Sequence, residues 1–262
     1  MSLNHEMPRL LTPRDVEAAM NLSLSAGWNQ TPGDWLRIMR LAPGGCFGID
    51  AGGRLAATAT VVCYGRDLAW IGMVLTAPVA RGRGFATRLM EHAIGLAPVS
   101  WIKLDATDMG RTLYLKLGFV DECPIERWEL KAAPACREEQ QDGLASDHAA
   151  MGADRSALFA ILAEEGHLQG RPGTRAVYFG PCASVTVGAA RNELCRFLNR
   201  NTDKPVYWDL LPDNGSAVDL AVEFGFRPVR CLTRMVRPGD GIPKPPAGDS
   251  SLIYAIAGFE YG

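Results

Sequence analysis

The 262-residue sequence lacks any apolar run long enough to cross a membrane, and its first 20 residues lack the apolar segment of a secretion signal. It also lacks an excess of positive charge: the formal net charge is −2, which argues against general nucleic-acid binding. These absences predict a cytoplasmic protein that has neither a membrane nor a nucleic acid as its partner.

Cysteine pairs with metal-binding spacing are lacking as well. The seven cysteines are odd in number, scattered along the chain and never spaced Cys-x-x-Cys. We therefore expect reduced thiols and no metal site. Hydrophobic residues make up 47% of the chain and charged residues 21%, which is typical of a globular protein with one large or two ordinary domains.

The most informative stretch is a glycine-rich turn between a predicted strand over residues 68–75 and a segment with helical spacing. Gly82 and Gly84 allow the backbone to approach a ligand closely, and the first N–H groups of the helix point outward there. Arg81 and Arg83 flank these N–H groups, and guanidinium groups bind phosphate oxygens bidentately. The turn therefore predicts a pyrophosphate site.

Three phosphate-loop templates were compared with this turn. A nucleoside-triphosphate loop requires Gly-Lys-Ser or Gly-Lys-Thr, whereas Phe85 and Ala86 follow the second glycine. The dinucleotide fingerprint is only half present, and no acidic residue clearly ends a second strand about 20 residues further on. The third template is Arg or Gln, two residues, Gly, one residue, and Gly or Ala, which Arg81, Gly84 and Ala86 satisfy. This pattern resembles the coenzyme A pyrophosphate loop of the GNAT superfamily of N-acyltransferases; a glycine-containing turn of any other α/β protein is the alternative.

A second motif follows in the order that the GNAT family shows. Residues 101–106 alternate as a strand does. In the family this strand leads to a helix with Asn, then a small residue at +3, Leu at +6, often Tyr at +7, and Gly-Phe at +11 and +12. The residues here are Thr107, Gly110, Leu113, Tyr114, Gly118 and Phe119, so that only the Asn is replaced. The resemblance implies an α/β (α+β) fold with a mixed, mostly antiparallel central sheet, a splayed pair of parallel strands and flanking helices.

The resemblance also implies acetyl-CoA as the co-substrate. Splayed strands expose backbone groups that can pair with the pantetheine amides as an added strand would. A backbone N–H near residues 74–75 could also meet the oxyanion. The expected cofactor-binding residues are Val74, Leu75, Thr76, Arg81, Gly82, Arg83, Gly84, Phe85, Ala86 and Thr87.

Two residues are expected to carry the chemistry. Tyr114 occupies the position of the family tyrosine that protonates the leaving thiolate, although a packing role is the alternative. Many relatives place a glutamate on the strand before the loop, but residues 70–75 contain no carboxylate. Asp105 is the favoured general base, and Asp108 is the alternative base or a helix cap.

The acceptor is harder to infer from the sequence. In GNAT proteins the region between the first two helices overhangs the acceptor site, which implies substrate contacts for Trp28, Asn29 and Trp35. For the two tryptophans, burial in the core is the alternative. We expect a small-molecule amine as acceptor, while its identity and the choice between monomer and homodimer stay open.

The second half repeats the first. Asn214, Ala217, Leu220, Gly225 and Phe226 occur at the offsets of the helix motif. Val185 replaces Arg81 and Ala221 replaces Tyr114, so the second copy is expected to be degenerate. The whole chain is similar to tandem proteins with an N-terminal GNAT domain and a C-terminal acetyltransferase-like domain. We therefore expect a catalytic domain over residues 1–132, a linker over 133–149 and a degenerate domain over 150–262.

These features lead to three functional hypotheses. The first is an N-acyltransferase that moves acetyl from acetyl-CoA to a primary amine by direct attack in a ternary complex. The second is a catalytically silent acyl-CoA-binding or sensor protein. The third is a nucleotide-binding enzyme, and the absence of lysine from residues 81–87 speaks against it.

Overall fold

The computed structural model describes residues 6–139, 141–243 and 247–262. The remaining residues fall in the expected first domain, linker and second domain, outside the described part of the chain.

Ten strands form one sheet with the order β1-β2-β3-β4-β5-β11-β6-β10-β8-β7, and β9 pairs with β12 separately. The strands are β1 (Arg9–Leu10), β2 (Cys46–Ala51), β3 (Arg54–Tyr64), β4 (Leu68–Thr76), β5 (Trp101–Ala106), β6 (Val120–Leu130), β7 (Gly170–Arg171), β8 (Val177–Phe179), β9 (Cys182–Ala183), β10 (Val206–Leu210), β11 (Arg227–Pro238) and β12 (Ile253–Ala255). The α-helices are α1 (Val16–Ser25), α2 (Pro32–Leu41), α3 (Phe85–Gly95), α4 (Asp108–Lys116), α5 (Asp147–Met151), α6 (Ser156–Glu164), α7 (Val187–Arg200) and α8 (Gly215–Glu223).

The first half is an antiparallel meander, β2-β3-β4, that delivers a parallel strand pair. The predicted strands over residues 68–75 and 101–106 are β4 and β5, and they pair in parallel through the helical connection α3. The mixed, mostly antiparallel sheet with flanking helices confirms the fold class predicted from the sequence.

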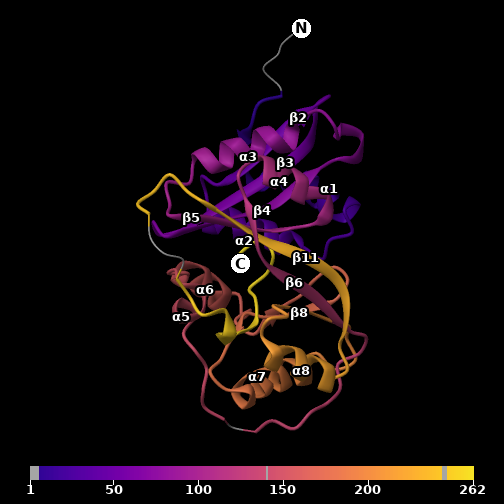
Figure 1. Cartoon of the computed structure of the whole chain (residues 1–262). Helices are drawn as coiled ribbons and strands as arrows, with labels where there is room; N and C mark the ends of the chain where they lie inside the picture. Colours follow the sequence, from indigo (N-terminus) through magenta and orange to yellow (C-terminus); the bar gives the residue numbers. More distant parts are fainter. Residues whose placement is uncertain (1–5, 140, 244–246) are drawn as a thin grey trace.

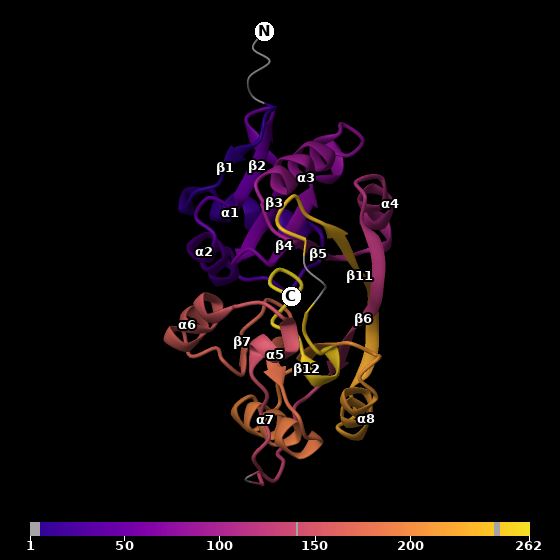
Figure 2. The same ribbon diagram turned by 60° about the vertical axis from the view of Figure 1, so that its left-hand side comes forward.

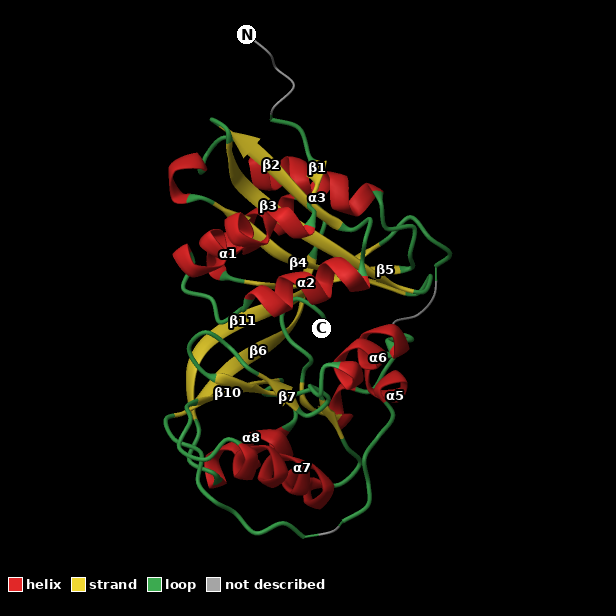
Figure 3. Ribbon diagram, turned by 180° about the vertical axis from the view of Figure 1, so that it is seen from behind, coloured by secondary structure: helices red, strands yellow, loops and turns green. Residues whose placement is uncertain are grey.

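Helices cover both faces of this half (Figure 3). Alternate residues of β4 divide between two cores, as the period of two in a strand requires. Trp70 packs with α1 and α2 on one face, and Ile71 packs with α3 and α4 on the other. The sheet edge at which β4 leads into α3 therefore lies between two well-packed layers.

The two halves exchange strands. β11, from the second half, pairs with β5 of the first half on one side and with β6 on its other side. β6 in turn pairs with β10 of the second half. Figure 1 shows β6 and β11 running between the two halves of the molecule. The chain therefore does not divide into two separate sheets at residues 133–149, because each half completes its sheet with a strand from the other.

The second half repeats the arrangement in reduced form. β8 pairs in parallel with β10, as β4 does with β5, and α7 and α8 cover this end of the sheet (Figure 1). The last described residues then return toward the first half, and the C-terminus lies between the two halves (Figure 2). Trp70 Nε1 donates to the Phe259 carbonyl oxygen at 2.9 Å, and the Tyr64 hydroxyl donates to that of Tyr261 at 2.9 Å. A segment from the end of the chain thus reaches the strand that precedes the glycine turn.

Candidate active site

β4 and β5 separate after a short paired stretch. Their pairing runs from Leu68 opposite Trp101 to Trp70 opposite Lys103, although both strands continue further. Beyond it β4 carries a bulge, where Met73 has a φ of +49°. The Thr58 hydroxyl donates to the Met73 carbonyl oxygen at 2.8 Å and holds this backbone in place. The expected splay is therefore present, next to residues that a bulge turns out of the regular ladder.

The glycine turn lies at the end of β4. Gly82 and Gly84 have φ values of +77° and +75°, a region that residues with a Cβ rarely adopt. Gly84 is the N-cap of α3, which begins at Phe85, so the free N–H groups of the first helical turn face outward. The Arg81 side chain is exposed beside them. This arrangement is suited to hold an anion of high charge.

A groove of about 960 Å³ connects this turn with Tyr114. The lining includes nearly every residue expected to bind the cofactor: Val74, Leu75, Thr76, Arg81, Gly82, Gly84, Phe85, Ala86 and Thr87. Arg83 does not line the groove. Its guanidinium forms an ion pair with Glu6 and lies 4.7 Å from the centre of the Phe85 ring, so its expected contact with the cofactor stays a prediction. The groove brings the phosphate-binding turn, the bulged strand and the candidate acid together on one surface.

Tyr114 reaches the groove because its helix leaves space for the ring. A Cβ on Gly110 would lie 2.8 Å from a carbon of the Tyr114 ring, so the small residue of the motif makes room for the tyrosine. The Tyr114 hydroxyl makes no hydrogen bond within the described residues, and its side chain borders the groove. Burial raises the pKa of Tyr114, which keeps the phenol protonated as a proton donor.

The helix that carries Tyr114 is capped by Thr107 rather than by Asp108. The Thr107 hydroxyl accepts a hydrogen bond from the Gly110 N–H at 3.3 Å, and Asp108 is the first helical residue. Thr107 thus caps α4 as Asn214 caps α8 in the second half.

Asp105, the favoured base, lies in an ion pair. Its two carboxylate oxygens accept from Nε and Nη2 of Arg234 on β11 at 2.9 and 3.1 Å. Burial raises the pKa of Asp105, while Arg234 opposes the shift. Asp105 borders a cavity of about 80 Å³ next to the groove, but both of its oxygens are engaged.

Of the expected acceptor residues, the structure brings Trp28 to the site. Trp28 lines both the groove and the smaller cavity. Asn29 instead links the two halves: its side chain bonds the backbone of Arg175 and Ala176 at 2.9 to 3.1 Å. Trp35 is fully buried in the core and lines neither space. The structure therefore corrects the expectation for Asn29 and Trp35, whose side chains are used for packing and tethering.

The smaller cavity, hereafter the acceptor cavity, adds residues that the sequence did not single out. It shares Trp28, Val74, Thr107, Tyr114 and Arg230 with the groove, and it also contacts Gln30, Arg127, Phe259 and Glu260. The backbone of Glu260 lies close to β4: a Cβ added to Gly72 would be only 2.8 Å from the Glu260 Cα. None of these residues belongs to a recognisable motif, so only the tertiary structure could have found them.

Glu260 is a second carboxylate at this place. Its Oε1 accepts from Arg171 Nη2 at 2.8 Å, and its Oε2 accepts from Gln30 Nε2 at 3.3 Å. Burial raises the pKa of Glu260, Arg171 opposes this shift, and the nearby Asp34 carboxylate adds to it. A buried carboxylate with a raised pKa beside the splay fits the general-base position that β4 leaves without an acid.

The corresponding part of the second half is filled by the chain itself. β12 pairs with β9, and Asn214 Nδ2 donates to the carbonyl oxygens of Ser251 and Ile253. At its turn, a Cβ on Gly188 would lie 1.6 Å from the Gln141 Oε1. Ala221 stands fully buried where the first half has Tyr114. Among the residues that the structure describes, the turn and the strand end of this half are therefore occupied by other parts of the chain.

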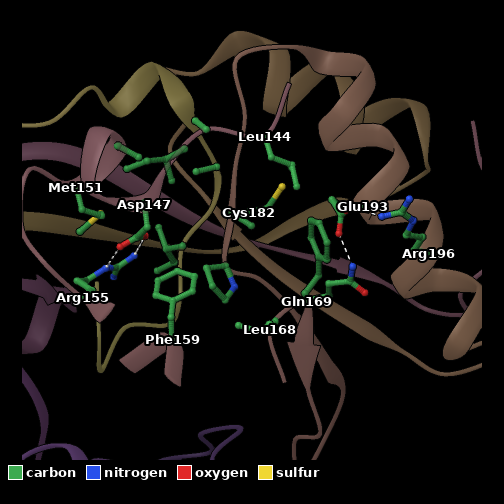
Figure 4. Close-up of a pocket in the computed structure, with 18 residues that line it drawn as sticks. Leu144, Asp147, Met151, Arg155, Phe159, Leu168, Gln169, Cys182, Glu193 and Arg196 are labelled. Atoms are coloured by element: carbon green, nitrogen blue, oxygen red, sulfur yellow. Dashed lines mark hydrogen bonds and ion pairs between the residues drawn. The ribbon is translucent and has the colours of Figure 1, made fainter. Parts of the chain in front are cut away.

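A cavity of about 380 Å³ is nevertheless present in the second half (Figure 4). The polar side chains at its border bond one another: Arg155 pairs with Asp147, and Gln169 Nε2 donates to Glu193 (Figure 4). Most of the remaining lining is apolar. The cavity thus lacks the free polar groups that the first half presents.

Clustered metal ligands and membrane-spanning helices are both absent from the described part of the chain. It contains no cluster of three or more His, Cys, Asp or Glu residues placed to hold a metal ion. It likewise contains no helix with the length and apolar character needed to span a membrane.

The splayed strands, the glycine turn and the groove define the class of protein: the acetyltransferase fold of the GNAT type, here in tandem. Residues 42–121 match the family model described as acetyltransferase (GNAT) domain, and this match supports acyl transfer as the class of reaction. No curated protein matches the sequence significantly.

Solved structures extend the likeness over the whole chain. A Pyrococcus horikoshii protein, provisionally assigned as an acetyltransferase, is 20% identical with a TM-score of 0.83 over 100% of this chain and 98% of its own. A GCN5-related N-acetyltransferase from Sphaerobacter thermophilus is 15% identical with a TM-score of 0.63, covering 93% of this chain and 99% of its own. A tandem GNAT protein from the clavulanic acid biosynthesis pathway is 15% identical with a TM-score of 0.59, covering 91% and 99%. At these identities the likeness establishes the tandem fold.

Proposed function

We propose that the protein is an N-acyltransferase that moves an acetyl group from acetyl-CoA to a primary amine of a small molecule. The observation that carries this proposal is the continuous groove from the glycine turn to Tyr114, because it combines an anion site with a proton donor at the splay of β4 and β5. Arg81 and the first N–H groups of α3 would hold the pyrophosphate, and the β4 backbone beyond the bulge would pair with the pantetheine.

Bound acetyl-CoA supplies the acyl group as a thioester, and this chain's residues handle the protons and the charge. The amine attacks the carbonyl carbon directly, so that a carbon–nitrogen bond forms as the carbon–sulfur bond breaks. Tyr114 donates a proton to the leaving sulfur. Glu260 or Asp105 accepts the proton that the amine loses, directly or through a water, and a backbone N–H at the Met73–Val74 bulge meets the oxyanion.

A silent acyl-CoA-binding protein is the second candidate. The observation that favours it is the full engagement of both Asp105 oxygens by Arg234, which leaves this carboxylate poorly suited to accept a proton.

Incubation with acetyl-CoA and a panel of amines, with thiol release as the readout, separates these candidates. We expect release with wild-type protein and a fall of about 10²-fold or more in kcat for Tyr114→Phe, the scale of general acid catalysis, with the affinity for coenzyme A unchanged. Binding of acetyl-CoA without turnover of any amine would support the silent protein instead. Unchanged turnover in Tyr114→Phe would remove this residue from the mechanism.

A further inference from the structure

Arg230 is a guanidinium without a partner at the acceptor end of the groove. It lies on β11, directly after the irregularity in the β11–β6 register that begins at Pro228, and it borders both the groove and the acceptor cavity. Its side chain is half-buried, yet it forms no hydrogen bond or ion pair with any residue that the structure describes. A partly desolvated charge of this kind is costly unless something pairs with it.

The neighbouring charged groups do not pair with Arg230, because they already form ion pairs with other residues. The other charged groups that border the acceptor cavity form ion pairs: Arg127 with Asp209, Asp105 with Arg234, and Glu260 with Arg171. Both oxygens of the nearby Asp209 accept from Arg127, at 2.7 and 2.6 Å. Burial and the neighbouring Arg127 lower the pKa of Arg230, so an added negative charge would be stabilised there.

A second unpaired group borders the same cavity. Gln30 is only 9% exposed, and its Oε1 has no hydrogen-bond partner in the structure. Its Nε2 donates to the Glu260 carboxylate, and this hydrogen bond orients the Gln30 amide so that its Oε1 points away from Glu260. A buried carbonyl oxygen without a donor is rare in folded proteins, and the N–H groups of an amine would satisfy it.

We propose that the acceptor is a compact amino carboxylate, with Arg230 binding its carboxylate and Gln30 Oε1 accepting a hydrogen bond from its amine. This inference rests on the proposed acyl transfer and names its substrate class. A planar guanidinium binds a carboxylate through two parallel hydrogen bonds, and a cavity of about 80 Å³ favours a small molecule. The second half would thereby supply a specificity residue to the site of the first half.

The turnover test compares amino acids with matched amines that lack the carboxylate, such as glycine with glycinamide and β-alanine with its amide. We expect kcat/KM of wild-type protein to favour the best acid over its amide by about 10-fold or more, the scale of a hydrogen-bonded charge pair. Arg230→Gln should abolish this preference without changing the KM for acetyl-CoA. Arg230→Lys, which keeps the charge but not the fork, should retain part of it.

Arg227→Gln is the matched control, because it removes the same charge from the same strand at an exposed position outside both spaces. It should preserve the wild-type preference. Equal turnover of acids and amides by wild-type protein would overturn the amino-carboxylate proposal and leave acyl transfer standing. A raised KM for acetyl-CoA in Arg230→Gln, with the preference intact, would likewise overturn it and assign Arg230 to the co-substrate.

A binding measurement decides the proposal even if no amine is turned over. Calorimetric titration of N-acetylglycine and N-acetylglycinamide into the protein with coenzyme A should show binding of the acid that Arg230→Gln removes and Arg227→Gln keeps. Equal affinity for acid and amide, or no binding of the acid, would contradict the anion site. Failure of acyl transfer itself would appear separately, as absence of thiol release with every amine.

Discussion

Two carboxylates border the acceptor cavity, and their surroundings differ. Asp105 accepts from Arg234 with both oxygens, at 2.9 and 3.1 Å, and burial raises its pKa while Arg234 opposes the shift. Glu260 pairs with Arg171, which also pairs with Asp34, and Asp34 has Arg37 as a further partner. Glu260 receives one guanidinium hydrogen bond where Asp105 receives two, so Glu260 is the more available proton acceptor.

The pH dependence of turnover should report on Glu260. Burial raises its pKa, with Arg171 opposing and Asp34 adding to the shift. The base must be ionised, so kcat at saturating substrates should fall as the pH drops through this raised pKa, at a higher pH than for an ordinary carboxyl group. Glu260→Gln should lower kcat by about 10²-fold and remove this acid limb of the pH profile.

Asp105→Asn is the comparison for that experiment. It leaves the buried Arg234 without its partner, so we expect mainly a lower melting temperature. An acid limb that persists in Glu260→Gln but disappears in Asp105→Asn would assign the base to Asp105.

The local residue pattern explains why part of the site could be predicted from sequence. The recognisable residues form two local pairs, Arg81 with Gly84 and Gly110 with Tyr114. The two members of each pair are only three or four residues apart, so their spacing in the sequence is enough to predict that they lie together. Glu260 carries no such signal, because its place depends on a fold-back from the far end of the chain.

At the scale of elements, β4 is the strand on which the site is built. One part of it pairs with β5, the next part bulges at Met73, and its Gly72 receives the returning segment around Glu260. The close approach of two backbones explains why glycine occupies position 72. The bulge and the fold-back thus bring the proposed oxyanion site on β4 and the candidate base Glu260 close together.

Substitution of Gly72 should loosen the contact between β4 and the segment around Glu260. The Cβ of Gly72→Ala would lie 2.8 Å from the Glu260 Cα and 3.2 Å from its carbonyl oxygen, and this backbone cannot move as a flexible side chain would. We expect faster amide hydrogen exchange over residues 253–262, a lower melting temperature and reduced turnover. Gly95→Ala, with open space around its Cβ, should leave all three unchanged. Unaltered exchange in Gly72→Ala would show that the segment is not held against β4.

Strands and helices of the first half were predictable because each has a local period and its own turn residues. The exchange of β6 and β11 between the two halves could not be predicted from the sequence. Both strands follow the same motif, and Arg127 and Arg234 stand at equal distances after their Gly-Phe pairs, so the sequence fits either pairing with β5. Only long-range contacts decide between them.

At the scale of the whole molecule, the degenerate second half has a structural reason to persist. It gives β11 to the sheet of the first half, and with it Arg230 and the partner of Asp105. At the turn of the second half, Gln141 of the expected linker takes the space next to Gly188. We therefore expect one co-substrate site per chain, formed by both halves.

Calorimetric titration of coenzyme A tests this central claim most directly. Wild-type protein should bind one equivalent per chain, and Arg81→Glu should weaken binding by about 10-fold or more, because a charge-assisted phosphate contact is replaced by repulsion. Arg83→Glu is the control, since that side chain pairs with Glu6 outside the groove, and it should change the affinity far less. Binding of two equivalents, or an affinity that Arg81→Glu leaves unaltered, would contradict the account.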